Sequence, residues 1–295
     1  MEGRFTRGTL DTVLHEVCAR LGFDPRGATL VRFTNNAVYS LAREPVVVRI
    51  VGSRTLRHRA RKVVAVAEHL ARHGVPAVRL LDGLAQPLSV GEHVVTVWHR
   101  VPAVGRRATT AELALLLRKV HRLPVPDGVG PWEPLVDVRA RIADAEELAE
   151  DDRRFLLDRC AEVSDRLAAL RFPLPACLVH GDAHPGNVVV GPDGPVLCDF
   201  DSSCHGPPEW DLTPLAVGRE RFGDPPAWYR NLAGGYGVDI TEWDGFATLR
   251  AARELKLTTS VLPILRSHPE VRHELYRRLD DLRAGRSDTR WVRYR

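Results

Sequence analysis

The pattern of hydrophobic residues changes once along this chain, near residues 98–104. Before this point, short runs rich in β-branched residues alternate with turn formers, and helical spacing is confined to residues 10–21 and 54–73. After it, long stretches such as residues 110–123 carry apolar residues at helical spacing. The sequence therefore predicts a small antiparallel sheet with a helix packed on it, followed by a larger helical part.

The expected strands of the first part are short and are separated by turn-forming residues. They comprise residues 29–33, 38–42, 46–51, 77–81 and 93–98. Beyond the helix at 110–123, helices are expected at residues 138–148, 152–170, 241–262 and 270–284. We predict an α+β fold with two lobes, residues 1–100 and 101–295. Clefts between lobes are common ligand sites.

Composition limits the partners of such a chain. The formal charge of +4 is mild, and nucleic-acid-binding proteins usually leave a stronger and more clustered basic footprint. The five cysteines form no Cys-x-x-Cys pair, and we find no signal peptide and no apolar run long enough to cross a bilayer. We therefore expect a reduced cytoplasmic protein, monomeric or homodimeric, with neither nucleic acid nor a membrane as partner. The tail at 291–295 is expected to be a frayed basic terminus.

Between the predicted helices lies a loop dense in polar side chains, followed by a hairpin. Pro192-Asp193-Gly194 separates two apolar runs and is typical of a three-residue hairpin loop with a bulge. If Gly191 pairs with Pro195, the register places Asn187 opposite Asp199. An amide carbonyl and a carboxylate on one face are hard oxygen ligands that suit Mg²⁺.

Asp182 precedes Asn187 by five residues and is expected close enough to accept a proton from a substrate hydroxyl. Kinase catalytic loops use the same parts: an aspartate base, an asparagine five positions later, and a later aspartate for the metal that bridges the phosphates. Asp201 is either a second metal contact or the residue that closes the loop.

The motif HGDAHPGN at 180–187, followed by CDFDSSCHGPPEWDL at 198–212, resembles the aminoglycoside phosphotransferase family, relatives of the eukaryotic-type kinases. The resemblance implies a bilobal protein-kinase-like fold and phosphorylation of a small-molecule hydroxyl, with ATP or GTP and Mg²⁺ as cofactors. It also implies roles for single residues: Asp182 as the catalytic aspartate, His180 as the brace of its loop, Asn187 and Asp199 as Mg²⁺ ligands, and Asp211 as a structural aspartate at the start of the next helix.

The resemblance extends to the first lobe, which it makes the nucleotide-binding lobe. Residues 32–39, which include Asn35 and Asn36, resemble the family's nucleotide loop, and Arg49 matches the strand residue that holds the α- and β-phosphates. Residues 95–99, including Val97 and Trp98, resemble the interlobe strand that borders adenine.

One departure concerns the partner of Arg49. The helix position that supplies a glutamate in the family falls near Val63, and Glu68 is the only acid of the helix predicted at 54–73. Either Glu68 serves through a shifted register, or Arg49 lacks this ion pair.

Other functions stay open at this point. His180, Asp182, His184 and Asp199 are also plausible ligands for the transition metal of a hydrolase. A kinase-like protein without catalysis is another alternative. The acceptor of a kinase is equally open, whether aminoglycoside, sugar, nucleoside, amino alcohol or a serine of a biosynthetic peptide. Candidate acids for a polycationic acceptor are Asp239, Glu242, Asp244 and Glu254.

Overall fold

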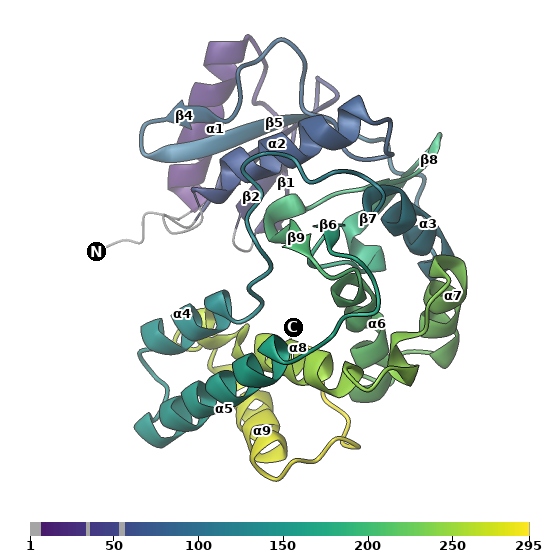
Figure 1. Cartoon of the computed structure of the whole chain (residues 1–295). Helices are drawn as coiled ribbons and strands as arrows, with labels where there is room; N and C mark the ends of the chain where they lie inside the picture. The colour runs from purple at the N-terminus through teal and green to yellow at the C-terminus, as the bar shows by residue number, and fades with distance from the viewer. Residues whose placement is uncertain (1–6, 34–35, 53–56, 295) are drawn as a thin grey trace. The chain divides into compact units, whose positions relative to one another are not determined.

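The computed structural model describes residues 7–33, 36–52 and 57–294. The chain divides into two compact units, whose elements are labelled in Figure 1. Unit 1 comprises residues 1–108, 119–130 and 185–204, and unit 2 comprises residues 109–118, 131–184 and 205–295. The hairpin that follows the polar loop therefore belongs to unit 1, although it lies far along the sequence. The assignment of nucleotide binding to residues 1–100 and catalysis to 101–295 stays a prediction.

Unit 1 is built on a five-stranded sheet with the order β1-β2-β3-β5-β4, in which all neighbours are antiparallel. The expected segment 77–81 forms no strand and makes only isolated bridges, whereas the edge strand β4 was not predicted. The strands are β1 (Thr29–Phe33), β2 (Asn36–Ser40), β3 (Val46–Val51), β4 (Leu88–Val90) and β5 (His93–His99).

The two faces of this sheet have different partners. Side chains directly opposite each other on neighbouring strands share a face, so Ala37, Ile50 and Val95 point one way. They join the buried residues of α1 (Arg7–Leu21) in one hydrophobic core. Arg49 and Thr96 are paired on the opposite face. Figure 1 shows α1 behind β5 and α2 (Arg59–Arg72) in front of it.

The hairpin of unit 1 consists of β7 (Val188–Gly191) and β8 (Gly194–Leu197), preceded by η2 (Pro185–Asn187) and followed by η3 (Phe200–Ser202). Its register differs from the predicted one. Gly191 pairs with Gly194 and Val190 with Pro195, so the turn has two central residues instead of three. Gly194, which closes the turn, has a positive φ of 112°, a conformation that favours glycine. Asn187 consequently lies opposite Cys198 rather than Asp199.

Unit 2 is mainly helical, and its first helix, α3 (Thr110–Val120), continues into the residues assigned to unit 1. The sequence placed α4, α5, α8 and α9 correctly to within a few residues, but it did not predict α7. A short pair of strands, β6 (Cys177–Val179) and β9 (Cys204–Gly206), accompanies the helices. The remaining helices are α4 (Val136–Asp144), α5 (Glu150–Ala168), α6 (Glu209–Arg221), α7 (Pro226–Tyr236), α8 (Phe246–Thr259) and α9 (Arg272–Arg283). Within the described ranges, no helix is both long and apolar enough to span a membrane.

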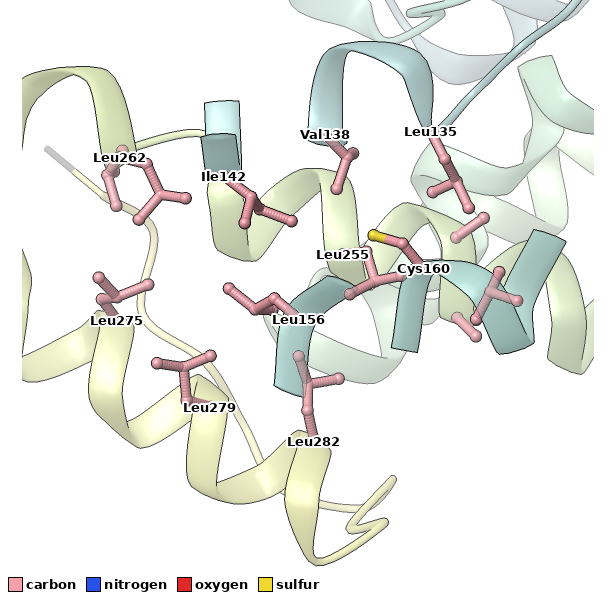
Figure 2. Packing of buried hydrophobic residues seen from close by; sticks show 14 of the residues in the cluster. Leu135, Val138, Ile142, Leu156, Cys160, Leu255, Leu262, Leu275, Leu279 and Leu282 are labelled. Atoms are coloured by element: carbon pink, nitrogen blue, oxygen red, sulfur yellow. The ribbon is translucent and has the colours of Figure 1, made fainter. Parts of the chain in front are cut away.

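The core of unit 2 is formed by leucines of several helices. Figure 2 shows Leu156 of α5, Leu255 of α8 and Leu279 of α9 pointing into the same apolar cluster, together with the Cys160 side chain. This cluster fixes α8, and the position of α8 matters for the site described below.

The C-terminal tail packs onto this unit, so the expectation of a frayed terminus is wrong for the described part of it. The indole of Trp291 is only 3% exposed, and its Nε1–H donates to Asp281 Oδ2 at 2.9 Å. The guanidinium groups of Arg221 and Arg278 stack over the ring, 4.4 and 4.9 Å from its centroid.

Candidate active site

The loop that carries Asp182 is held by the start of α6. Asp211, fully buried in the first turn of this helix, accepts the backbone N–H groups of His180 and Gly181, both at 2.7 Å. Trp210 Nε1–H donates to the carbonyl of Gly181 at 3.2 Å. Gly181 has a φ of 82°, a conformation that favours glycine. The next residue, Asp182, is therefore presented from a fixed backbone, and Asp211 has the structural surroundings that the resemblance implied.

Asp182 is half-buried and is paired with a cation that the sequence analysis missed. Its Oδ1 accepts a hydrogen bond of 2.9 Å from Nη1 of Arg253, a residue of α8 that is only 8% exposed. The Nε2 of His184 lies 3.8 Å from the other carboxylate oxygen. Burial alone would raise the pKa of Asp182, but Arg253, Lys256 and His184 outweigh it and hold this pKa well below its usual value.

Lys256 is the second cation that the sequence analysis missed. Its Nζ lies 5.9 Å from the centroid of the Trp210 ring, the same indole that bonds Gly181. Burial lowers the pKa of Lys256 below its ordinary value. The one available signal in the sequence was the spacing of Arg253 and Lys256, which are three positions apart and therefore share one face of a predicted helix.

His180 is buried and interacts with the loop backbone. Its side chain is 2% exposed, and its Nδ1 accepts the backbone N–H of Asp182 at 3.4 Å. This long hydrogen bond joins the ring to the backbone that precedes the carboxylate of Asp182. The contact supports the bracing role over a role in chemistry, and the assignment itself stays a prediction.

The two predicted metal ligands lie in unit 1, at the base of the hairpin. Asn187 is 2% exposed, and its backbone carbonyl accepts the N–H of Cys198 at 3.0 Å. Asp199 has φ and ψ of 69°, the left-handed conformation that non-glycine residues adopt rarely. Because this conformation interrupts the alternation of the strand, the direction of the Asp199 side chain cannot be inferred by counting along β8.

Each of the two aspartates after β8 is paired with an arginine of the sheet. Arg32 of β1 donates from Nη1 to Asp199 Oδ2 at 2.8 Å. Arg49 of β3, 9% exposed, forms an ion pair with Asp201. Glu68 lies exposed on α2, and among the described residues no ion pair joins it to Arg49, which agrees with the second alternative, that Arg49 lacks the helix ion pair. A carboxylate from η3 takes the place of the missing helix glutamate.

The two aspartates influence each other's protonation. Burial and the neighbouring Asp201 raise the pKa of Asp199, against the opposing effect of Arg32 and Arg49. Burial also acts to raise the pKa of Asp201, but Arg49 outweighs it and lowers this pKa. The protonation of each aspartate therefore depends on the other aspartate and on the two arginines.

The predicted nucleotide residues do not all lie on one face of the sheet. Asn36 and Trp98 alternate onto the same face as Arg49, and Trp98 Nε1–H donates to Thr96 Oγ1 at 2.8 Å. The side chain of Val97 points to the α1 face, and its backbone N–H and C=O are hydrogen-bonded within unit 1. The structure therefore does not bring Val97 together with Arg49. Asn35 lies outside the described residues.

Unit 2 contains a cavity of about 480 Å³ between α4 and α5, lined by residues that include Trp132, Arg139 and Phe172. None of the site residues predicted from the sequence lines it. In the part of the chain that the structure describes, no group of three or more histidine, cysteine, aspartate or glutamate side chains is arranged to hold a metal ion.

A basic residue on the third strand of an antiparallel sheet, a loop aspartate followed five positions later by an asparagine, and a further aspartate after a hairpin are features of the protein-kinase-like phosphotransferases. The chain belongs to the phosphotransferase enzyme family, whose sequence profile matches residues 32–255. The family resemblance inferred from the two motifs is thereby confirmed. No curated protein sequence matches the chain.

Solved structures of kinases share this fold. Amicoumacin kinase hAmiN, in complex with AMP-PNP, Ca²⁺ and Ami, is similar with a TM-score of 0.72 and 14% identity, over 96% of this chain and 98% of that chain. Choline kinase LicA from Streptococcus pneumoniae has a TM-score of 0.67 and 16% identity, over 92% and 99%. A choline/ethanolamine kinase family protein from Mesorhizobium loti has a TM-score of 0.65 and 20% identity, over 92% and 94%. The predicted α+β, protein-kinase-like fold is confirmed.

Proposed function

We propose that this phosphotransferase moves the γ-phosphoryl group of ATP or GTP to a hydroxyl of a small molecule, with Asp182 as the catalytic base. The observation that carries the proposal is the fixed position of Asp182. Asp211 and Trp210 hold the backbone before it by three hydrogen bonds, while its carboxylate stays half-exposed. A base must be held in place and remain accessible to the proton that it receives.

Asn187 and Asp199 suit Mg²⁺ by their chemistry. Each contributes an oxygen donor, and Mg²⁺ is usually bound by one or two carboxylates together with waters and substrate phosphates. The left-handed backbone of Asp199 is the kind of strained conformation that clusters at functional sites. When bound, Mg²⁺ neutralises charge on the β- and γ-phosphates.

Asp182 is the residue of this chain proposed to act on the acceptor during the transfer. Asp182 orients the acceptor hydroxyl and takes its proton as the oxygen forms a bond to the γ-phosphorus and the bond to the β,γ-bridging oxygen breaks. The products are a phosphate ester and the nucleoside diphosphate. Because Arg253 lowers the pKa of Asp182, the base is ionised throughout the neutral range, and we expect it to take the proton late in the transfer.

Arg49, oriented by Asp201, is the proposed ligand of the α- and β-phosphates. A guanidinium fixed by one carboxylate still presents further N–H donors to phosphate oxygens. Asn35, Asn36 and Trp98 complete the proposed nucleotide site. The Arg49–Asp201 pair supports the role proposed for Arg49, because it orients the guanidinium without a glutamate from α2.

Mg²⁺-dependent nucleotide binding tests the proposal. Asp199→Asn keeps a residue that tolerates the left-handed backbone but removes the charge. We expect this variant to bind ATP almost equally with and without Mg²⁺ in calorimetry and to lose turnover, while the wild type binds ATP better with Mg²⁺. Asp193→Asn at the exposed hairpin turn is the matched control. Equal Mg²⁺ dependence in wild type and Asp199→Asn would show that Asp199 is no metal ligand.

A further inference from the structure

Two cations of α8 lie beside the proposed base. Arg253 and Lys256 are three residues apart and so share one face of the helix. Arg253 donates to Asp182 at 2.9 Å. Lys256 lies over Trp210, whose indole bonds the residue directly before Asp182. The two cations therefore place positive charge next to Asp182, the residue proposed to receive the proton of the acceptor hydroxyl.

The charge of Lys256 is not matched by a carboxylate in contact. Among the described residues, no ion pair or hydrogen bond of its ammonium is found, and the side chain is half-buried. Its charged neighbours are Asp182, Arg253, Arg141 and Asp137. Together with Lys256 itself, these are three cations against two carboxylates. Since Asp182 already bonds Arg253, the cluster keeps an excess of positive charge that a bound anion would offset.

Two of the acids considered for a polycationic acceptor have structural partners. Asp239 accepts from the hydroxyl of Tyr229 at 2.7 Å and from the backbone of Thr241 at 2.9 Å. Glu254 is 5% exposed and pairs with Arg221 at 2.6 Å. An acidic pocket for ammonium groups is therefore not assembled from these two residues.

We propose that Arg253 and Lys256 bind an anionic group of the acceptor, a carboxylate or a phosphate carried next to the hydroxyl that Asp182 receives. The inference rests on the proposed phosphotransferase function and narrows its acceptor class to hydroxy acids and phosphorylated alcohols. An ammonium group in the same place would meet two like charges. The guanidinium of Arg253 carries five N–H donors, so it can hold Asp182 and an anion together.

The chain's lysines offer a direct test, because it has only Lys62, Lys119 and Lys256. Their ¹³C-methylation keeps the charge and gives a few separate NMR signals. The protein is loaded with Mg²⁺ and AMP-PNP, then titrated with glycerol 3-phosphate, with glycerate, and with glycerol as the neutral match. The Lys256 signal, assigned from its loss in Lys256→Arg, should shift saturably with at least one of the anions and not with glycerol. The exposed Lys119 is the internal reference. No Lys256 shift with either anion, or a parallel shift of Lys119, overturns the proposal.

Variants give an independent measurement by calorimetry under the same conditions. Lys256→Gln should weaken binding of the anion by about 10- to 100-fold, the range for losing a charge-assisted hydrogen bond. Lys256→Arg keeps the positive charge and should therefore bind the anion more tightly than Lys256→Gln does. Arg266→Gln removes an equal charge from an exposed position of unit 2 and should change nothing. Equal losses in Lys256→Gln and Arg266→Gln would indicate a general charge effect and overturn the site.

Failure of the anion site is distinguishable from failure of the proposed function. A wild-type protein that binds Mg²⁺-nucleotide and phosphorylates only neutral or cationic acceptors, without a Lys256 response, overturns the anionic acceptor and leaves the phosphotransferase in place. A protein that binds no nucleotide overturns the proposed function. The titration is then repeated without AMP-PNP, and the Lys256 response alone decides the anion site.

Discussion

Arg49 of β3 is paired with Asp201, two residues after the proposed metal ligand Asp199. The residue proposed to hold the nucleotide phosphates and the residue proposed to hold the metal are thus coupled through one short segment of unit 1. In this arrangement α2 contributes no carboxylate to Arg49, although it contacts η3, the segment that carries Asp201.

This pairing predicts that Asp201, not Glu68, orients Arg49 for the nucleotide. Asp201→Asn should weaken binding of Mg²⁺-ATP by about tenfold or more, since the guanidinium loses its charged partner. Glu68→Gln, at an exposed position of α2, should leave the affinity unchanged. In a double-mutant cycle, the losses from Arg49→Gln and Asp201→Asn should be strongly non-additive. Additive losses, or a loss with Glu68→Gln equal to that with Asp201→Asn, would contradict the pairing.

The role of Asp182 as the base predicts a large effect on turnover and a small one on nucleotide binding. Asp182→Asn should lower kcat by about two to four powers of ten, the range for a positioned general base. The dissociation constant of Mg²⁺-ATP should stay within a factor of about three, because the proposed nucleotide ligands lie in unit 1. Stopped assays of nucleotide consumption against a responsive acceptor measure the first quantity and calorimetry the second. Near-normal turnover of a folded variant would remove Asp182 from the chemistry.

Asp211 is predicted to stabilise the loop of Asp182. Its carboxylate accepts two buried backbone N–H groups, and Asp211→Ala leaves both without their acceptor. The free energy of unfolding should fall by about 2–6 kcal/mol, from about 1–3 kcal/mol for each unsatisfied group. Urea unfolding measures this loss, and Asp244→Ala at an exposed position is the control. A change below 1 kcal/mol, on the order of a surface substitution, would mean that water or another acceptor replaces the carboxylate.

The sequence predicted the fold and the main motifs because these depend on local patterns. Strands 29–33 and 46–51 were predicted with their observed bounds, since β-branched runs and turn residues are strong local signals. The hairpin register was wrong by one residue. Its type depends on whether Gly194 ends the turn or lies within it, and both arrangements suit Pro-Asp-Gly.

The parts of the site that the sequence could not supply depend on tertiary contacts. Arg253 is 71 positions from Asp182, and no motif joins the two residues. Asp201 was weighed only as a metal contact or a loop residue, since its pairing with Arg49 spans 152 positions. The left-handed conformation of Asp199 could not be predicted from the sequence either, because most aspartates adopt negative φ and only the folded loop imposes this exception.

The C-terminal tail is predicted to contribute to stability. Trp291 is buried beneath the guanidinium groups of Arg221 and Arg278, and large-to-small changes at such aromatic positions cost about 3–5 kcal/mol. Trp291→Ala should therefore lower the free energy of unfolding by this amount. Val292→Ala, where the wild-type side chain is 62% exposed, should have little effect. Equal stability of Trp291→Ala and wild type in urea unfolding would show that the tail is dispensable.

The lowered pKa of Lys256 predicts that its charge costs stability at neutral pH. The folded protein releases this proton at a lower pH than the unfolded chain does, whose lysines titrate near the ordinary value of about 10.4. Below the folded-state pKa the native protein carries the full cost, and the cost disappears as the pH rises toward the unfolded value. Lys256→Met should therefore be more stable than wild type at neutral pH, and the difference should shrink as the pH approaches 10.4.

Urea unfolding across this pH range measures the difference, with the exposed Lys119→Met as control. Asp182, Arg253, Arg141 and Asp137 are the charged neighbours that set the size of the effect. At neutral pH, a bound anion should reduce the difference in free energy of unfolding between Lys256→Met and wild type. It stabilises the charged ammonium of wild-type Lys256, which has no carboxylate in contact in the protein alone. A difference between Lys256→Met and wild type that stays constant with pH would show that the variant acts by packing and not through the charge of Lys256.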